Sequence, residues 1–206
     1  MKNKSILSAG LILIAGLGLA FADTAEKTVL IQTPSVKQQD GKIKEFKDIL
    51  FKLVRQDEYL DEALETLDSS SGPAGAEDLA ALGVSLKTIA GNLKHISSLN
   101  KTEFSSIQPG SALSNYTNTI LSYSRKVNRK VGKVNVLVAQ LAAKNKKASM
   151  RDAVSSKGGK KVRGKKLTQI LDEKAAVEKL SADVRNLRAA SRDLAATSKW
   201  LYIASQ

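Results

Sequence analysis

The chain has 206 residues, 42% of them hydrophobic and 4% aromatic, and its 33 Lys and Arg against 20 Asp and Glu give a net charge of +13. This length suits one domain with a sizeable core. The scarcity of aromatic residues beside many Leu, Ala, Val and Ile favours packed helices over a β-sandwich or barrel. Because the chain has no cysteine, disulfide bonds, thiol chemistry and a lipid-modified cysteine are excluded.

Residues 1–22 have the features of a secretory signal peptide. Lys2 and Lys4 precede an apolar run, which ends in the small-x-small pattern Ala20-Phe21-Ala22. We therefore expect an exported protein that is periplasmic, extracellular or on the cell surface after cleavage; an uncleaved N-terminal anchor is the alternative. A short signal with lysines at its start is typical of bacteria.

The next segment, 23–42, has no clear hydrophobic period and is expected to be a flexible tether. A helix is predicted over 43–68, because apolar residues then recur three or four positions apart. This apolar stripe skips Asp57, and the sequence SSSGPAG at 69–75 ends it. Its members are Ile43, Phe46, Leu50, Leu53, Leu60, Leu64 and Leu67.

The second helix, predicted over 76–98, has the most regular pattern in the chain. Its apolar residues alternate spacings of three and four, as in a coiled-coil seam that requires helical partners. Glu77 and Asp78 fall in its first turn, where acidic side chains complement the helix dipole. His95 lies off the seam and is read as a surface or boundary residue. The seam consists of Leu79, Leu82, Leu86, Ile89, Leu93 and Ile96.

Two longer helices are predicted over 112–147 and 166–204, each with an apolar stripe at helical spacing. The last helix also carries Ala and Ser beside its leucines, which permits a neighbouring helix to approach closely. Near its end, Trp200 and Tyr202 are expected to close the open end of the core.

These elements predict an all-α fold, an antiparallel up-down-up-down four-helix bundle within 43–206. The hairpin of the third and fourth helices should be longer than the first, with a basic loop at 148–165 at its tip. A pair of hairpins that completes its core by dimerisation is the alternative.

No pattern for catalysis, metal or cofactor binding is found. The spacing Gly159-x₄-Gly164-Lys165 is close to a nucleotide-binding loop, but no strand precedes it and Lys166 stands where Ser or Thr would bind magnesium. An acidic face on the first helix is interpreted as structural, since the acids lack histidine partners and a solvated face is the simpler explanation. Its members are Asp57, Glu58, Asp61, Glu62 and Glu65.

The clearest functional feature is a block of positive charge from Lys144 to Lys166, opposed only by Asp152, while the rest of the chain after residue 22 is close to neutral. Such a block attracts anionic polymers or membrane surfaces. It contains no aromatic residue, so base stacking is unsupported and sequence-specific nucleic-acid binding is not expected. The acidic end of the first helix is expected to lie beside it and partly neutralise it. The residues proposed to contact an anion or partner are Lys157, Lys160, Lys161, Arg163, Lys165 and Lys166.

The sequence therefore predicts an exported, non-enzymatic interaction module that contacts an anionic partner or envelope polymer through a basic loop. Peripheral membrane contact and homo-oligomerisation remain open. The alternative is a structural or oligomeric helical envelope protein with no dedicated anion site.

Overall fold

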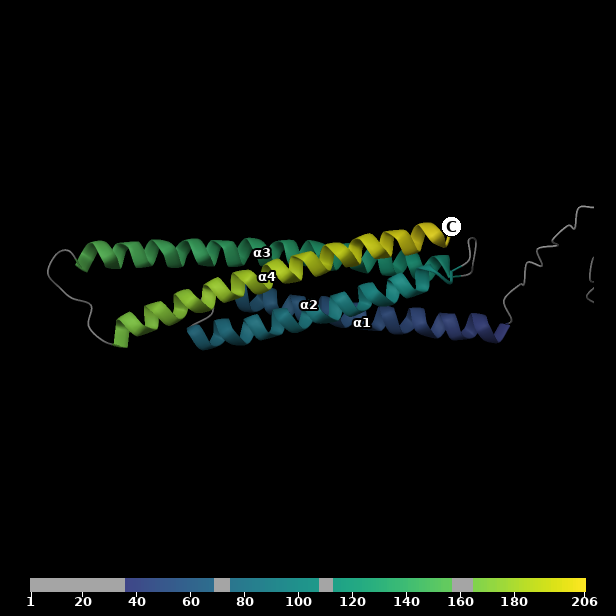
Figure 1. Cartoon of the computed structure of the whole chain (residues 1–206), viewed down its shortest axis with the longest axis horizontal. Coiled ribbons are helices and arrows are strands. Elements are labelled where there is room, and N and C mark those ends of the chain that lie inside the picture. Colours follow the sequence, from purple (N-terminus) through teal and green to yellow (C-terminus); the bar gives the residue numbers. More distant parts are fainter. Residues whose placement is uncertain (1–35, 69–74, 108–112, 157–164) are drawn as a thin grey trace, which may run out of the picture. The chain divides into compact units, whose positions relative to one another are not determined.

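The computed structural model describes residues 36–68, 75–107, 113–156 and 165–206, with side chains described over 41–68, 75–107, 113–147 and 168–206. The described residues form four α-helices and no strand, which confirms the predicted all-α fold (Figure 1). The helices are α1 (Val36–Asp68), α2 (Ala76–Phe104), α3 (Ser114–Ser156) and α4 (Lys165–Ala204). None of these four combines the length and apolarity that crossing a bilayer requires. The predicted signal peptide lies outside the described residues.

Several helices extend further than their hydrophobic patterns indicate. α1 begins at Val36, inside the segment expected to be a tether, although Gly41 costs about 1 kcal/mol relative to alanine in a helix. Tertiary contacts stabilise the first part of α1. Phe46 is fully buried, and the Lys42 ammonium lies 2.6 Å from the Glu103 carboxylate of α2. α3 continues to Ser156, so the first part of the predicted basic loop is helical.

α2 also continues past its apolar seam, for a different reason. Its last two turns place Asn100 and Glu103 in buried positions that continue the seam, where apolar residues would be expected, and Ser97 beside them is buried too. In the sequence, polar residues at these positions indicate the end of the helix. In the fold their side chains bond to neighbouring helices, and the helix ends only at Phe104.

The core runs along the facing stripes of all four helices. Every residue of the predicted α2 seam is buried, and the large side chains on the other helices meet it. Burying one such Leu or Ile side chain contributes about 1.5–3 kcal/mol, so this core is the main source of stability. The largest fully buried side chains are Phe46, Ile49, Leu53, Leu60, Leu86, Ile89, Leu93, Ile96, Ile120, Leu180, Leu187 and Leu194.

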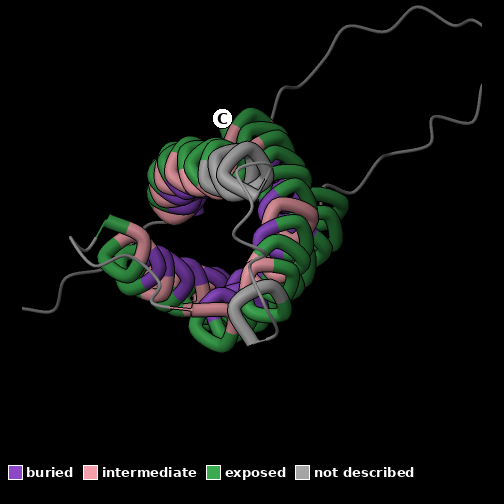
Figure 2. The backbone as a smooth tube through the Cα atoms, turned by 90° about the vertical axis from the view of Figure 1, so that its left-hand side faces the viewer, coloured by how far each residue is buried: buried purple, intermediate pink, exposed green. Residues whose placement is uncertain are grey.

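The helices do not pack in chain order. α1 contacts α2 and α3, and α4 contacts α2 and α3, with the most extensive packing between α2 and α4. In the described parts of the chain, α1 does not contact α4, and α2 does not contact α3. The order around the bundle is therefore α1, α2, α4, α3, with buried residues directed inwards (Figure 2).

Of the two C-terminal aromatic residues expected to close the core, Trp200 does not do so, whereas Tyr202 is half-buried. Trp200 is 60% exposed, whereas Leu201 and Ser205 are buried. The reason is the register of α4, because Leu187, Leu194 and Leu201 recur at heptad spacing and place position 200 on the outward side.

Candidate functional site

A cluster of ion pairs joins α1 to α3. Asp57 is buried, and its two carboxylate oxygens each lie 2.6 Å from an ammonium group, one of Lys126 and one of Lys130. Lys130 also reaches Asp61 at 2.6 Å and donates a hydrogen bond to the backbone carbonyl of Asp57. Burial by itself raises the pKa of Asp57, but the hydrogen bonds and charges of the two lysines outweigh this effect, so its pKa lies below the usual value.

This cluster changes the interpretation of the predicted acidic face. Asp57 and Asp61 pair with lysines of α3, not with the basic loop, because α3 lies directly beside this part of α1. Glu58, Glu62 and Glu65 are exposed. The gap that Asp57 leaves in the apolar stripe was the available signal, since a charge at a core position requires a partner on a neighbouring helix.

The predicted anion-binding residues are only partly described. Lys157, Lys160, Lys161 and Arg163 lie outside the described residues. Lys165 and Lys166 occupy the first turn of α4, where positive charge opposes the helix dipole; their side chains are not among those described.

The described structure adds a basic face on α3. Five basic side chains are exposed there, and none forms an ion pair or hydrogen bond with another described side chain; they are Arg125, Arg129, Lys133, Lys144 and Lys147. All other charged residues of α3 are also basic, with the single exception of Asp152. The first three recur four residues apart and therefore share one side of the helix, opposite the buried Val127, Val131 and Val134.

The sequence-based prediction missed the first part of this face. Arg125, Arg129 and Lys133 lie before the charge block at 144–166, in a stretch whose overall charge is balanced by the acids of α1. The balance is misleading, because Lys126 and Lys130 pair with Asp57 and Asp61, while Arg125, Arg129 and Lys133 pair with no described acid. The four-residue spacing of Arg125, Arg129 and Lys133 was the signal that could have revealed this part of the basic face.

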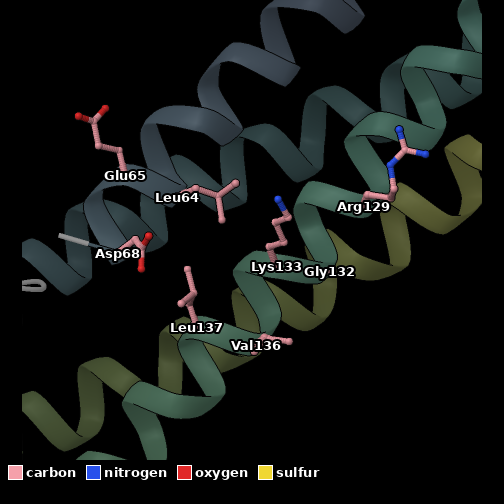
Figure 3. A pocket seen from close by; sticks show the side chains of 8 residues that line it. All are labelled: Leu64, Glu65, Asp68, Arg129, Gly132, Lys133, Val136 and Leu137. Atoms are coloured by element: carbon pink, nitrogen blue, oxygen red, sulfur yellow. The ribbon is translucent and has the colours of Figure 1, made fainter. Parts of the chain in front are cut away.

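A groove lies between α1 and α3 beside this face. Its volume is about 590 Å³, and Figure 3 shows the side chains that line it. Leu64, Leu137 and Val136 supply its apolar surface, and charged residues of opposite sign come from the two helices. The lining residues are Leu64, Glu65 and Asp68 from α1, with Arg129, Gly132, Lys133, Val136 and Leu137 from α3.

A second polar group lies inside the bundle, where α4 meets α2 and α3. The Asn100 amide donates to the Ser198 hydroxyl at 2.9 Å, and the Ser198 hydroxyl lies 2.6 Å from that of Ser124. The Ser97 hydroxyl donates to Asp193, and this bond, with the nearby Lys101, lowers the pKa of Asp193 although burial opposes the shift.

These contacts join α4 to α2 and α3. His95 is exposed, and within the described part of the chain it forms no hydrogen bond or ion pair with Ser97 or Asp193. Among the described residues, no three His, Asp or Glu side chains are grouped closely enough to hold a metal ion. No family model, curated protein or solved structure matches this chain.

Proposed function

We propose that the protein is a non-enzymatic interaction module that binds an anionic polymer along the basic face of α3. The observation that carries this proposal is the exposed row of Arg125, Arg129, Lys133, Lys144 and Lys147, none of them paired with a described acid. From position 125 to position 147 the row spans about 33 Å at 1.5 Å per residue. Such a row suits a chain of repeated phosphate, sulfate or carboxylate groups.

Binding of this kind depends on charge and not on shape. Each contact between a base and a phosphate-like group releases a condensed counterion, so affinity falls steeply as salt rises. The same positive field accelerates encounter with the polymer. The basic segment at 157–166 would extend the contact, and the signal-like residues 1–22 favour an envelope or extracellular polymer as the ligand.

We also infer the chain directions within the bundle. Two residue pairs, Lys42 with Glu103 and Gln56 with Asn92, support antiparallel α1 and α2. Ser97 with Asp193 and Asn100 with Ser198 support parallel α2 and α4. By the same reasoning α3 would run antiparallel to α4, because Thr117 meets Ser205 and Ser124 meets Ser198. It would run parallel to α1, where Asp57 meets Lys126 and Asp61 meets Lys130. Directions would then alternate along the chain, while half of the packed pairs would be parallel.

The polymer proposal can be tested by removing charge from α3 outside the groove. The triple variant Arg125→Gln, Lys144→Gln and Lys147→Gln should bind heparin or polyphosphate more weakly. The slope of log affinity against log salt should fall by about 2–3, because about 0.7–0.9 is lost per contact. Fluorescence titration at several salt concentrations measures both quantities.

A matched control removes the same charge elsewhere. Lys87, Lys94 and Lys179 are exposed on α2 and α4, and their triple change to Gln should leave the salt slope nearly unchanged. Equal weakening by the two triple variants would show that only net charge matters. That result would reject the α3 face and favour the alternative of a structural envelope protein.

A further inference from the structure

We propose that the groove between α1 and α3 binds a small zwitterionic amphiphile, a molecule with an apolar chain, one phosphate-type anion and one ammonium group. This inference goes beyond polymer binding, since a fully polar polyanion requires neither an apolar surface nor acidic residues. At about 590 Å³, the groove falls within the 300–1,000 Å³ range that is usual for small-molecule sites.

The first argument concerns charges that face each other without pairing. Asp68 stands on the α1 side and Arg129 and Lys133 on the α3 side, and none of them forms an ion pair or hydrogen bond with a described side chain. About three turns before Asp68 on α1, and within one turn of Lys133 on α3, the same two helices bring opposite charges to 2.6 Å at Asp57 and Lys130. The separated charges in the groove leave room for a ligand that carries both signs.

The second argument concerns the apolar surface between those charges. Figure 3 shows Leu64, Leu137, Asp68 and Lys133 directed into the space between the two helices, while Glu65 points away from it. Val136 is 52% exposed and adds apolar area on α3. An apolar chain on these residues would place an ammonium group towards Asp68 and a phosphate towards Lys133, with Arg129 as a further cation.

The third argument concerns Gly132, which lines the groove from the middle of α3. A Cβ atom at this position would meet no atom within 4 Å, so no contact in the chain requires glycine there. A helix-interior glycine costs about 1 kcal/mol relative to alanine. Its absent side chain keeps this part of the groove open, and the same open space allows the groove to be filled by substitution without a clash.

The test uses a short-chain lysophosphatidylethanolamine below its critical micelle concentration, with binding to the full chain measured by calorimetry. Gly132→Leu fills the groove and should weaken binding at least about tenfold, which corresponds to losing the burial of a few methylene groups. Gly132→Ala should retain most of the affinity. Gly91→Leu adds the same side chain at another open helical position and should bind like the wild type.

A second variant tests the ammonium contact. Asp68→Asn should weaken lysophosphatidylethanolamine but leave the ammonium-free lysophosphatidylglycerol unchanged. Removing an acid from the C-terminal turn of α1 relieves its repulsion with the helix dipole, so this variant should fold. Equal losses for the two lipids in Asp68→Asn would overturn the proposal. So would a Gly132→Leu variant that binds lysophosphatidylethanolamine as tightly as the wild type does.

The groove and the polymer proposal fail separately. Gly132→Leu changes no charge and should leave heparin binding intact, whereas the triple variant at Arg125, Lys144 and Lys147 spares every groove residue and should leave lysolipid binding intact. Loss of both activities in either variant would show that the two sites are not distinct, and would contradict this inference.

Discussion

Asp57 is the residue at which sequence pattern and tertiary structure differ most clearly. It occupies a position in the α1 stripe between Leu53 and Leu60, both fully buried. A carboxylate at such a position is costly unless it is paired, and Lys126 and Lys130 supply two ammonium groups from α3. The pair of lysines therefore stabilises the α1–α3 interface only as long as Asp57 is ionised.

Replacing Asp57 with asparagine should lower the free energy of unfolding by about 1–3 kcal/mol at neutral pH, since a charge-assisted hydrogen bond to a buried group is lost. The pKa of Asp57 is depressed in the folded state. Its contribution is thus complete above the ordinary carboxyl pKa of about 3.9 and is lost as pH falls through the lower folded value. Urea denaturation at pH 7 and below pH 4 should show the difference between wild type and variant shrinking.

Asp48 provides the control for this prediction. It pairs with Lys52 one turn away on the exposed side of α1, and such surface pairs contribute about 0–1 kcal/mol. Asp48→Asn should therefore change stability little at either pH. If the two variants lost the same stability at pH 7, the buried position of Asp57 would have no special importance.

At the scale of single helices, the basic residues of α3 divide into a paired and an unpaired group. Lys126 and Lys130 form ion pairs with acids of α1. Arg125, Arg129 and Lys133 are exposed and form none with a described residue. Neighbouring residues in a helix lie about 100° apart, so Arg125 and Arg129 point in other directions than Lys126 and Lys130. Lys126 and Lys130 pair with Asp57 and Asp61, whereas Arg125, Arg129 and Lys133 form no ion pair with a described acid and remain available to the proposed ligand.

The glycines of α2 and α3 give a prediction at this scale. Gly91→Ala should raise the free energy of unfolding by about 0.5–1 kcal/mol, because alanine is the better helix former and its Cβ meets nothing within 4 Å. Gly83→Ala should gain less, since its Cβ would lie 3.2 Å from the Asp183 carboxylate of α4. Urea denaturation of both variants measures the difference. Equal gains would mean that α2 and α4 do not approach closely at Gly83.

At the scale of the whole molecule, the order of the helices around the core differs from their order in the chain. α2 packs most extensively on α4, although the helix that follows α2 in the chain is α3. The bonds of Asn100, Ser198 and Ser124 join three helices within the core. Buried polar pairs of this kind fix register more than they add stability, because a shifted register would leave them without partners.

The inferred parallel run of α2 and α4 can be tested with spin-label distances. The chain has no cysteine, so labels at Lys101→Cys and Ala196→Cys are unambiguous. With parallel helices these labels should lie close together, and labels at Lys101→Cys and Ala175→Cys should lie about 30 Å apart at 1.5 Å per residue. The reverse order of the two distances would show that α2 and α4 run antiparallel.

Part of the candidate site could be read from the sequence. The excess of bases in the last third of the chain was evident, and so was the seam of α2, because each depends on local spacing. The first part of the basic face of α3 and the groove were not predicted, because both depend on which residues of α1 lie opposite α3. Trp200 was misjudged for the same reason, as the register of α4 against its neighbours decides which side it occupies.

By itself, the sequence determined the all-α class, the number of helices and the apolar stripe of each one, because helix periodicity and breakers such as SSSGPAG act over a few residues. The tertiary structure decided the order of the helices around the core and the partners of Asp57. It also decided which bases remain exposed and where a groove opens. These features depend on contacts between residues far apart in the chain, and several pairings are compatible with the same local pattern until the whole core packs.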